Sequence, residues 1–353
     1  MYNIEVTMKT QTPIYTGDAF GKSNVLKPQP ILGSLRFWLE VFCYAAGELN
    51  INCKNEKVDR DELFKKVNNI IEEQEVSLFE AKKNALKELG VSIPSQVFGC
   101  NGWEGFVKIN EINFCKKQIR LPKAIYKNKN KSDGWNEIYP GDNRPIDKKK
   151  EHVWYFPVSS LFGEAKIKLE LADEKIGDDI IFPLLSFIQK YGFFGGRNNL
   201  GFGRVKFNLE NFNLSEFNQF RFYNRIITID DVIEEKEKFD DLINDDLVKK
   251  RKIGFYELDP DKSQNEDSIE KKYLNMIETL LSEKSMLRYR CKQKYIKNKE
   301  KRHFVFGFTG KNEEGKIEET NATKIIPWIN HIAENNYKYG FISLILLETF
   351  PRG

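Results

Sequence analysis

The sequence predicts an α+β protein made of two ferredoxin-like domains, which are RRM-like and have the order βαββαβ. Strand-like and helix-like segments follow one another in that order between residues 3 and 209. A glycine-rich loop joins the last helix of the series to its last strand. The chain has 353 residues, more than the ~100–200 usual for one domain. We therefore expect an N-terminal domain over residues 1–215, with helical and loop insertions, and a degenerate C-terminal domain over 216–353.

The first elements follow from the spacing of apolar residues. Residues 3–10 alternate with period two, which predicts a half-buried strand. Glycines and prolines punctuate residues 11–30, so we expect a long connection without a helix there. Residues 31–47 have a helical period and end in a glycine. The charged residues 58–89 predict an inserted pair of helices that ends at Gly90.

The second half of the N-terminal domain needs two more strands, a helix and the closing strand. Residues 105–114 and 164–172 predict the middle strands. Residues 178–192 begin with acids, which suit the positive end of a helix, and Pro183 fits the first turn. Residues 202–209, which follow the glycine-rich loop, predict the fourth strand.

The C-terminal third is less regular. Residues 217–231 read as extended, and residues 268–285 have the apolar spacing of an amphipathic helix. We expect strands at 302–310 and 339–350, the second of them buried. The acidic residues 230–246 would be the entry to this domain, with a solvated helix face; their role is open.

Charge is segregated along the chain, although the net charge is only +4. Residues 116–150 hold eleven Lys and Arg against four Asp and Glu, and residues 286–303 hold eight against one. Such clustering indicates basic faces for a polyanion. Solvated loops are the alternative for either run.

The remaining composition restricts the compartment and the cofactors. No apolar run approaches the ~20 residues of a membrane span, and the N-terminus lacks a signal-peptide core. We therefore expect a cytoplasmic protein without a membrane partner. The five cysteines are scattered and never spaced as Cys-x-x-Cys, so we expect reduced thiols and no metal site.

The glycine-rich loop, "YGFFGGRNNLGFGRVKF" at 191–207, does not match two common phosphate-binding motifs. Gly196 and Gly201 have the Walker spacing, but Phe202 and Gly203 replace the required lysine and hydroxyl. The dinucleotide fingerprint lies between a strand and a helix, whereas this loop follows a helix and opens a strand. The remaining interpretation is a loop whose backbone amides, with Arg197 and Arg204, meet a sugar-phosphate chain.

A helix, a glycine-rich loop with an arginine, and Gly-Phe-Gly-Arg-Val at the last strand together resemble the RAMP superfamily, the repeat-associated proteins of CRISPR systems. The blocks "TPIYTG", "PQPILGSLRFWLEVF", "VFG", "KRHFVFGF" and "ATKI" resemble its first subunit in the type III-B (Cmr) effector complex. The resemblance implies two ferredoxin-like domains and a non-catalytic, RNA-binding subunit at the end of the complex remote from the 5′ tag. It implies as partners the guide RNA near its 3′ end, the target RNA and other Cmr subunits.

The resemblance and the basic clusters together give a set of residues that we expect to contact RNA. They are Lys22, Lys27, Ser34, Arg36, Gly195, Gly196, Arg197, Asn198, Gly201, Gly203, Arg204, Arg288, Arg290, Arg302, His303 and Lys324. We expect no catalytic residue, no metal and no cofactor.

Several of these predictions have alternatives. Arg36 could contact phosphate or pair with Glu40 four positions later. Phe37, Trp38 and Phe42 could stack on bases, but aromatic residues of a buried helix more often belong to the core. Residues 287–304 interleave cations with aromatic rings, as single-stranded RNA requires, or form an exposed basic hairpin.

A second function is a metal-independent endoribonuclease that processes CRISPR RNA. Such an enzyme needs a general base near a ribose 2′-hydroxyl. His303, beside Lys301 and Arg302, and His152 are the candidates. An unrelated RNA-binding module of ferredoxin-like fold is the third possibility.

Overall fold

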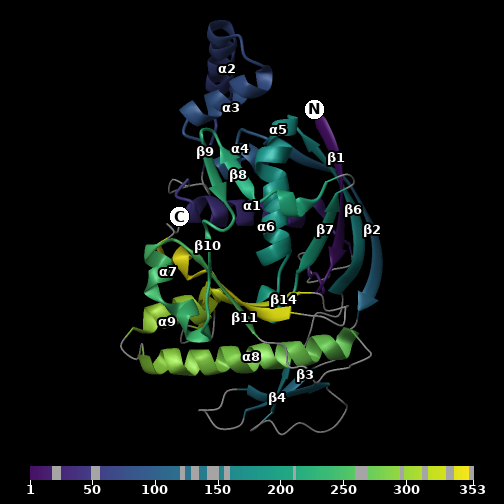
Figure 1. Ribbon diagram of the computed structural model, residues 1–353, viewed down its shortest axis with the longest axis vertical. Helices are drawn as coiled ribbons and strands as arrows, with labels where there is room; N and C mark the ends of the chain where they lie inside the picture. The colour runs from purple at the N-terminus through teal and green to yellow at the C-terminus, as the bar shows by residue number, and fades with distance from the viewer. Residues whose placement is uncertain are drawn as a thin grey trace.

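The computed structural model describes most of the chain. The described residues are 1–17, 25–48, 56–119, 124–128, 135–140, 151–154, 160–209, 212–258, 269–294, 298–311, 317–330 and 338–349. Lys22 lies outside them. Figure 1 shows an elongated molecule with the N-terminal sheet above and the C-terminal sheet below.

The predicted mixture of helices and largely antiparallel sheets is confirmed. The strands are β1 (Tyr2–Thr10), β2 (Val107–Ile119), β3 (Ala124–Asn128), β4 (Trp135–Pro140), β5 (Glu151–Trp154), β6 (Ser160–Leu171), β7 (Val205–Leu209), β8 (Gln219–Phe222), β9 (Arg225–Thr228), β10 (Ile233–Glu235), β11 (Ile253–Leu258), β12 (Phe308–Lys311), β13 (Ile317–Asn321), β14 (Ile325–Asn330) and β15 (Lys338–Ser343). The α-helices are α1 (Pro28–Ala45), α2 (Arg60–Gln74), α3 (Leu78–Glu88), α4 (Ile93–Phe98), α5 (Glu174–Ile176), α6 (Phe182–Tyr191), α7 (Asp245–Lys249), α8 (Ile269–Lys294) and α9 (Lys299–Phe306).

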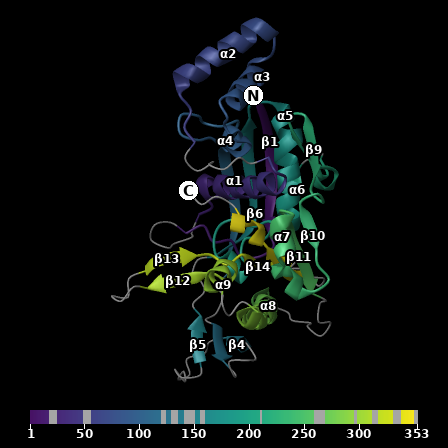
Figure 2. The same cartoon turned by 90° about the vertical axis from the view of Figure 1, so that its left-hand side faces the viewer.

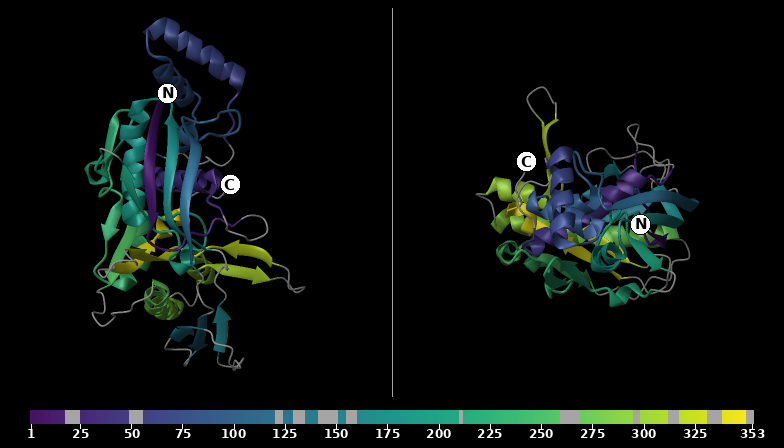
Figure 3. Two further views of the ribbon diagram at one scale, coloured as in Figure 1. Left: turned by 90° about the vertical axis from the view of Figure 1, so that its right-hand side faces the viewer. Right: turned by 90° about the horizontal axis from the view of Figure 1, so that it is seen from above.

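The N-terminal sheet has the strand order β2-β6-β1-β7, and every neighbouring pair is antiparallel. Met8 of β1 lies opposite Ala165 of β6 and Phe207 of β7. Since α1 lies between β1 and β2 in the chain and α6 between β6 and β7, the predicted order of strands and helices is present. Both helices cover the same face of the sheet, and the other face has no helix over it (Figure 3, left).

Helix α1 begins at Pro28, three residues before the predicted start. The sequence prediction excluded this stretch because prolines break helices. Prolines are tolerated in the first turn, however, because the amides there have no partner within the helix. In α6 the predicted first-turn position of Pro183 is confirmed, and a π-helical turn, Gly177–Ile181, comes before it.

Two insertions extend the N-terminal half. Helices α2 and α3 form the predicted pair and project from the top of the molecule (Figure 2). Strands β4-β3-β5 form a small antiparallel sheet that no prediction anticipated. This sheet lies below α8, which separates it from the C-terminal sheet in both views (Figures 1 and 2).

The C-terminal sheet does not repeat the N-terminal order within the described residues. Its strand order is β10-β11-β15-β14, and β10 is parallel to β11. Strand β11, helix α8 and the β14-β15 pair follow the first half of the predicted arrangement. The fourth position is taken by β10, which precedes β11 in the chain.

The prediction of a strand at 302–310 is confirmed only for residues 308–310, which lie in β12, and is wrong for the residues before them. Most of this segment belongs to α9, which begins where the Asn298 side chain accepts a hydrogen bond from the Lys301 amide at 3.0 Å. It ends at Gly307, whose φ is +77°. The run of apolar residues 304–306 has no period that separates a helix from a strand, so the cap and the glycine decided the outcome. Of the predicted strand at 339–350, residues 339–343 lie in β15, and Ile345–Thr349 form a 3-10 helix instead.

One apolar core runs from the N-terminal sheet into the C-terminal half. It joins residues of β1, α1 and α6 to Phe255, Trp328 and Ile342 of the C-terminal sheet. A second cluster joins Phe202 of the glycine-rich loop to Tyr273 of α8. No helix in the described part of the chain is long and apolar enough to cross a membrane.

Candidate functional site

Burial divides the glycine-rich loop into an outer half, residues 195–199, which are exposed or half-buried, and an inner half, residues 200–204, which are buried. Gly201 and Gly203 of the inner half are buried and have φ values of +73° and +89°. A Cβ on Gly201 would lie 2.9 Å from Ile329 Cδ1, and one on Gly203 would overlap the carbonyl oxygen of Phe194. These two glycines, expected to contact RNA, instead allow the loop to pack tightly within the protein.

Several amides of the loop, which we expected to face phosphate, bind other parts of the chain. Gly196 donates to the carbonyl oxygen of Tyr15 at 2.8 Å, and Gly203 donates to that of Pro13 at 2.8 Å. Gly195 donates to the Ser34 hydroxyl at 3.0 Å. The loop is thus fastened to the connection after β1 and to α1, and the expectation that these amides bind RNA is corrected.

Arg204 also has a structural position. It is fully buried, and its guanidinium donates to five backbone carbonyls, four at the C-terminal end of α6 and one on β14. Burial lowers the pKa of Arg204 to about 9, yet five acceptors favour the charged form. The acceptors are Ile188, Gln189, Lys190, Gly192 and Ile329. We therefore leave Arg204 out of any RNA-binding surface.

The outer half of the loop is accessible. Arg197 is exposed, with φ +64°, and its guanidinium carbon lies 5.5 Å from the centre of the Tyr15 ring. Asn198 begins a short 3-10 turn and is half-buried. A cation stacked on an aromatic ring keeps its charge available to an anion while its position is restricted.

An open pocket of about 480 Å³ lies between this half-loop, the connection after β1 and the first turns of α1, and its lining includes Gly196 and Asn198 on either side of Arg197. Ser34 of α1 ties the two sides together, since its hydroxyl donates to Pro30 O at 2.8 Å and accepts from Gly195. Phe37 lines the pocket with its side chain 40% exposed. Trp38 and Phe42 belong to the core, as expected. Tyr15 was not predicted to line a pocket, whereas Phe37 was among the aromatic residues that could stack on bases.

Lys27 is exposed at the N-cap of α1 and is not among the residues that line this pocket. Arg36 is held within the protein: it pairs with Glu40 at 2.8 Å and donates to Ser95 Oγ at 2.8 Å and to the Gly99 carbonyl. The pairing alternative for Arg36 is therefore the one that the structure adopts.

Helices α8 and α9 bring a second group of predicted residues together, although they are separated in sequence. Burial, followed by the nearby charges of Arg302, Lys299 and Arg288, lowers the pKa of His303. Lys324 Nζ donates to Ala322 O at 2.8 Å and lies 4.7 Å from the centre of the Phe304 ring. We define Arg288, Lys299, Arg302 and His303 as the α8–α9 cationic cluster.

Arg290 points to a different partner. Its guanidinium forms an ion pair with Asp240 at 2.9 Å, and both side chains are about half exposed. Lys301 likewise pairs with Asp245 and, at 3.5 Å, with Glu348. Two cations of the basic run are thus paired with the acidic stretch, which places the negative residues beside the α8–α9 cationic cluster.

His152 lies on β5, and its side chain is outside the described part. Among the described residues, no group of three His, Cys, Asp or Glu side chains could hold a metal ion.

The open face of the N-terminal sheet is polar. Lys168 pairs with Glu111 at 2.6 Å, Lys166 pairs with Glu5 at 3.4 Å, and Lys206 is exposed. RRM domains stack bases on aromatic residues of this face. Ion pairs stand in the corresponding place here, so the sheet face is a poor candidate for RNA.

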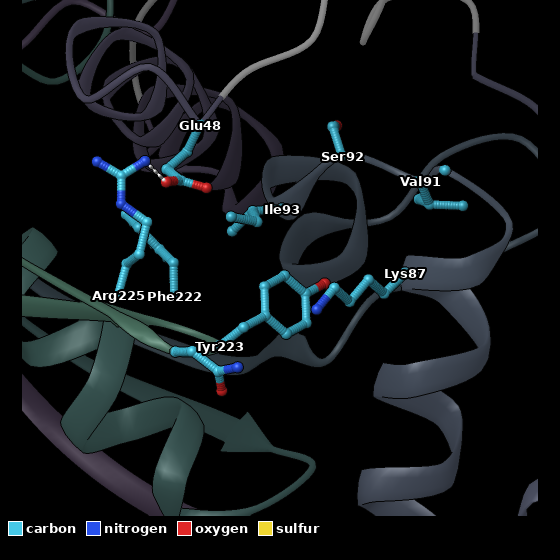
Figure 4. Close-up of a pocket in the computed structure, with 10 residues that line it drawn as sticks. Glu48, Lys87, Val91, Ser92, Ile93, Phe222, Tyr223 and Arg225 are labelled. Carbon is cyan, nitrogen blue, oxygen red and sulfur yellow. Dashed lines mark hydrogen bonds and ion pairs between the residues drawn. The ribbon is translucent and has the colours of Figure 1, made fainter.

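A smaller pocket, of about 340 Å³, lies between the β8-β9 turn and the ends of α1 and α3. Figure 4 shows Arg225 paired with Glu48, and Lys87 near the Tyr223 ring. The Lys87 ammonium is 4.2 Å from the ring centre, and burial raises the pKa of Tyr223 to about 12. Glu48 balances Arg225 in this pocket, which leaves Lys87 as the lining cation without an ion pair drawn to it in Figure 4.

Comparison with known proteins adds a family. The family model described as the RAMP superfamily matches residues 7–206. No curated protein matches the chain. Among solved structures, Cmr1 from Pyrococcus furiosus in its apo form is similar with a TM-score of 0.37 and 14% identity, covering 97% of this chain and 87% of that one.

Two further solved structures are similar. A chain of a type IV-B CRISPR complex has a TM-score of 0.31 and 14% identity, covering 59% of this chain and 90% of that one. A chain of the type III-B Cmr-beta complex, which is bound to cognate target RNA and AMPPnP in the presence of ssDNA, has a TM-score of 0.38 and 13% identity. The match covers 96% of this chain and 93% of that one.

Proposed function

The chain belongs to the RAMP superfamily, and from that premise we propose that it is a non-catalytic, RNA-binding subunit of a type III-B CRISPR (Cmr) effector complex. Its ligands would be the guide RNA, near the 3′ end, and the target RNA. Its protein partners would be other RAMP subunits. On this proposal both halves descend from ferredoxin-like domains, and the C-terminal one has lost its regular fourth strand.

The observation that carries the proposal is the position of Arg197. The guanidinium is exposed above the Tyr15 ring, beside a pocket that also presents the ring of Phe37. Single-stranded RNA offers phosphates and base faces together, so cations next to aromatic planes suit it. The α8–α9 cationic cluster would supply further phosphate contacts.

The direct test is RNA binding by the whole chain, measured as a function of salt. Each phosphate contact contributes about 0.7 to the slope of log K against log salt for a single strand. Arg197→Ala and Arg302→Ala should each weaken binding for any RNA sequence and lower the slope by about that amount. Lys206→Ala is the matched control, since this exposed lysine lies on the open sheet face.

Equal slopes for Arg197→Ala and Lys206→Ala would remove Arg197 from the interface. Membership of an effector assembly is tested separately, by co-purification with other RAMP subunits of the proposed complex. Failure to recover a complex would leave an RNA-binding module that works alone.

The second candidate is a metal-independent endoribonuclease, which the environment of His303 favours. A lowered pKa keeps its imidazole neutral at neutral pH, as a general base must be, and the neighbouring cations could stabilise a pentavalent phosphate. Incubation of the protein with repeat RNA in EDTA separates the two functions. Site-specific cleavage that disappears in His303→Ala would replace the non-catalytic proposal.

A further inference from the structure

Helix α1 contains a glycine whose surroundings do not require one. Gly33 lies in the interior of an 18-residue helix, where glycine costs about 1 kcal/mol relative to alanine. No atom of the described residues would lie within 4 Å of a Cβ placed on it. Close packing therefore does not explain this glycine, unlike Gly195, where a Cβ would overlap Tyr15 O.

The empty space over Gly33 belongs to the pocket beside Arg197. Pro30, Gly33, Ser34 and Phe37 are spaced to lie on one face of α1, and all four line this pocket. Gly33 thus forms a notch in the helix surface. Phe37 lies one turn further along, and its ring is 40% exposed, so it is accessible to a ligand in the pocket.

The rest of the pocket lining holds few large side chains. It consists of Tyr15, Thr16, Gly17, Phe193, Gly195, Gly196 and Asn198. The walls are therefore mostly apolar and partly aromatic, with polar groups on Thr16, Ser34 and Asn198. The charged Arg197 lies between the lining residues Gly196 and Asn198 and over the lining ring of Tyr15. A flat, uncharged group that carries an anionic tether matches this distribution better than an extended phosphate chain does.

We propose that this pocket holds one unstacked nucleobase of the bound RNA, in the notch over Gly33 and against Phe37, while Arg197 contacts the adjoining phosphate. This inference rests on the proposed function, because the ligand is the same single-stranded RNA. It adds that binding depends on a base at this pocket, in addition to the sugar-phosphate backbone.

The helical position of Gly33 allows a test that does not disturb the fold. Gly33→Leu puts a side chain into the notch, in a backbone conformation that leucine favours, and should leave the phosphate contacts intact. The affinity of the full chain for a short oligoadenylate is compared with that for an abasic ribose-phosphate oligomer of equal length. Thermal unfolding checks that each variant is folded.

Wild-type protein should bind oligoadenylate about tenfold more tightly than the abasic oligomer, as expected for stacking of one base. Gly33→Leu should lose this advantage and keep its affinity for the abasic oligomer. Phe37→Ser should behave similarly, whereas Phe64→Ser, a change at an aromatic side chain 67% exposed on α2, should have no effect.

Equal wild-type affinities for the two oligomers would overturn the proposal, and so would an undiminished preference in Gly33→Leu. In either case, a loss of affinity in Arg197→Ala would leave the proposed function standing. If wild-type protein bound neither oligomer, the proposed function itself would fail.

Discussion

Two arginines of one loop, Arg197 and Arg204, have opposite roles because their burial differs. Arg197 is exposed and stacked on Tyr15, so its charge faces solvent. Arg204 is fully buried, and its donors satisfy five carbonyls. The sequence treats the two alike, and only their surroundings separate a candidate ligand contact from a structural one.

The same substitution at Arg204 and at Arg197 should change the free energy of unfolding by different amounts. Arg204→Met would leave buried carbonyl oxygens without donors, at about 1–3 kcal/mol for each one that water cannot reach. We expect the free energy of unfolding to fall by about 3 kcal/mol or more, as measured by urea denaturation. Arg197→Met should change it by less than about 0.5 kcal/mol. Similar values for the two variants would contradict the structural role of Arg204.

Substitution by alanine should change the free energy of unfolding in opposite directions at Gly203 and at Gly33. Gly203→Ala should lower the free energy of unfolding by about 1–3 kcal/mol or more, because φ is +89° and the new Cβ meets Phe194 O. Gly33→Ala should raise it by about 0.5–1 kcal/mol, because the site is helical and open. Chemical denaturation measures both. A destabilising Gly33→Ala would show that the notch has a packing role.

We expect RNA binding to depend on pH because His303 gains or loses a proton. In the free protein its pKa lies below the usual value, owing to burial and then to Arg302, Lys299 and Arg288. Phosphates beside the α8–α9 cationic cluster would raise that pKa, so the complex would hold more protons than the free protein. RNA affinity should therefore increase as the pH falls through the pKa of His303 in the complex, and level off below its pKa in the free protein. Titrations at several pH values measure this, and the dependence should vanish in His303→Gln.

At the scale of single elements, α9 illustrates how one capping residue can position residues that are candidates for function. The helix has only 8 residues, and it holds Arg302 and His303 next to α8. Since so short a helix is marginal by itself, its cap matters. Asn298→Ala should cost about 1 kcal/mol and increase amide hydrogen exchange in α9, while Asn298→Ser should preserve both. Equal exchange in the two variants would show that packing alone holds α9.

At the scale of the whole molecule, the glycine-rich loop and α6 join the two halves. Arg204 and Trp328 both donate to the carbonyl of Lys190, and the main apolar core contains residues of both sheets. The boundary predicted near residue 215 is thus crossed by a continuous core. The β8-β9 hairpin also lies across it, since Phe220 stacks on Phe42 with ring centres 3.8 Å apart.

This shared core predicts that the two halves unfold together. Calorimetry should record one transition, and Trp328→Ala should lower its midpoint without splitting it. Two transitions, of which only one responds to the substitution, would indicate halves that unfold independently.

The sequence by itself determined the N-terminal architecture, because a period of two and a helical period need only local spacing to be recognised. It also determined the glycine-rich loop and the basic runs. Only the tertiary structure decided which half of that loop is exposed, that Arg36 pairs with Glu40, and that Arg288 approaches His303. Burial and pairing depend on segments far apart in the chain, such as β14 over Arg204, and local spacing carries no information about them.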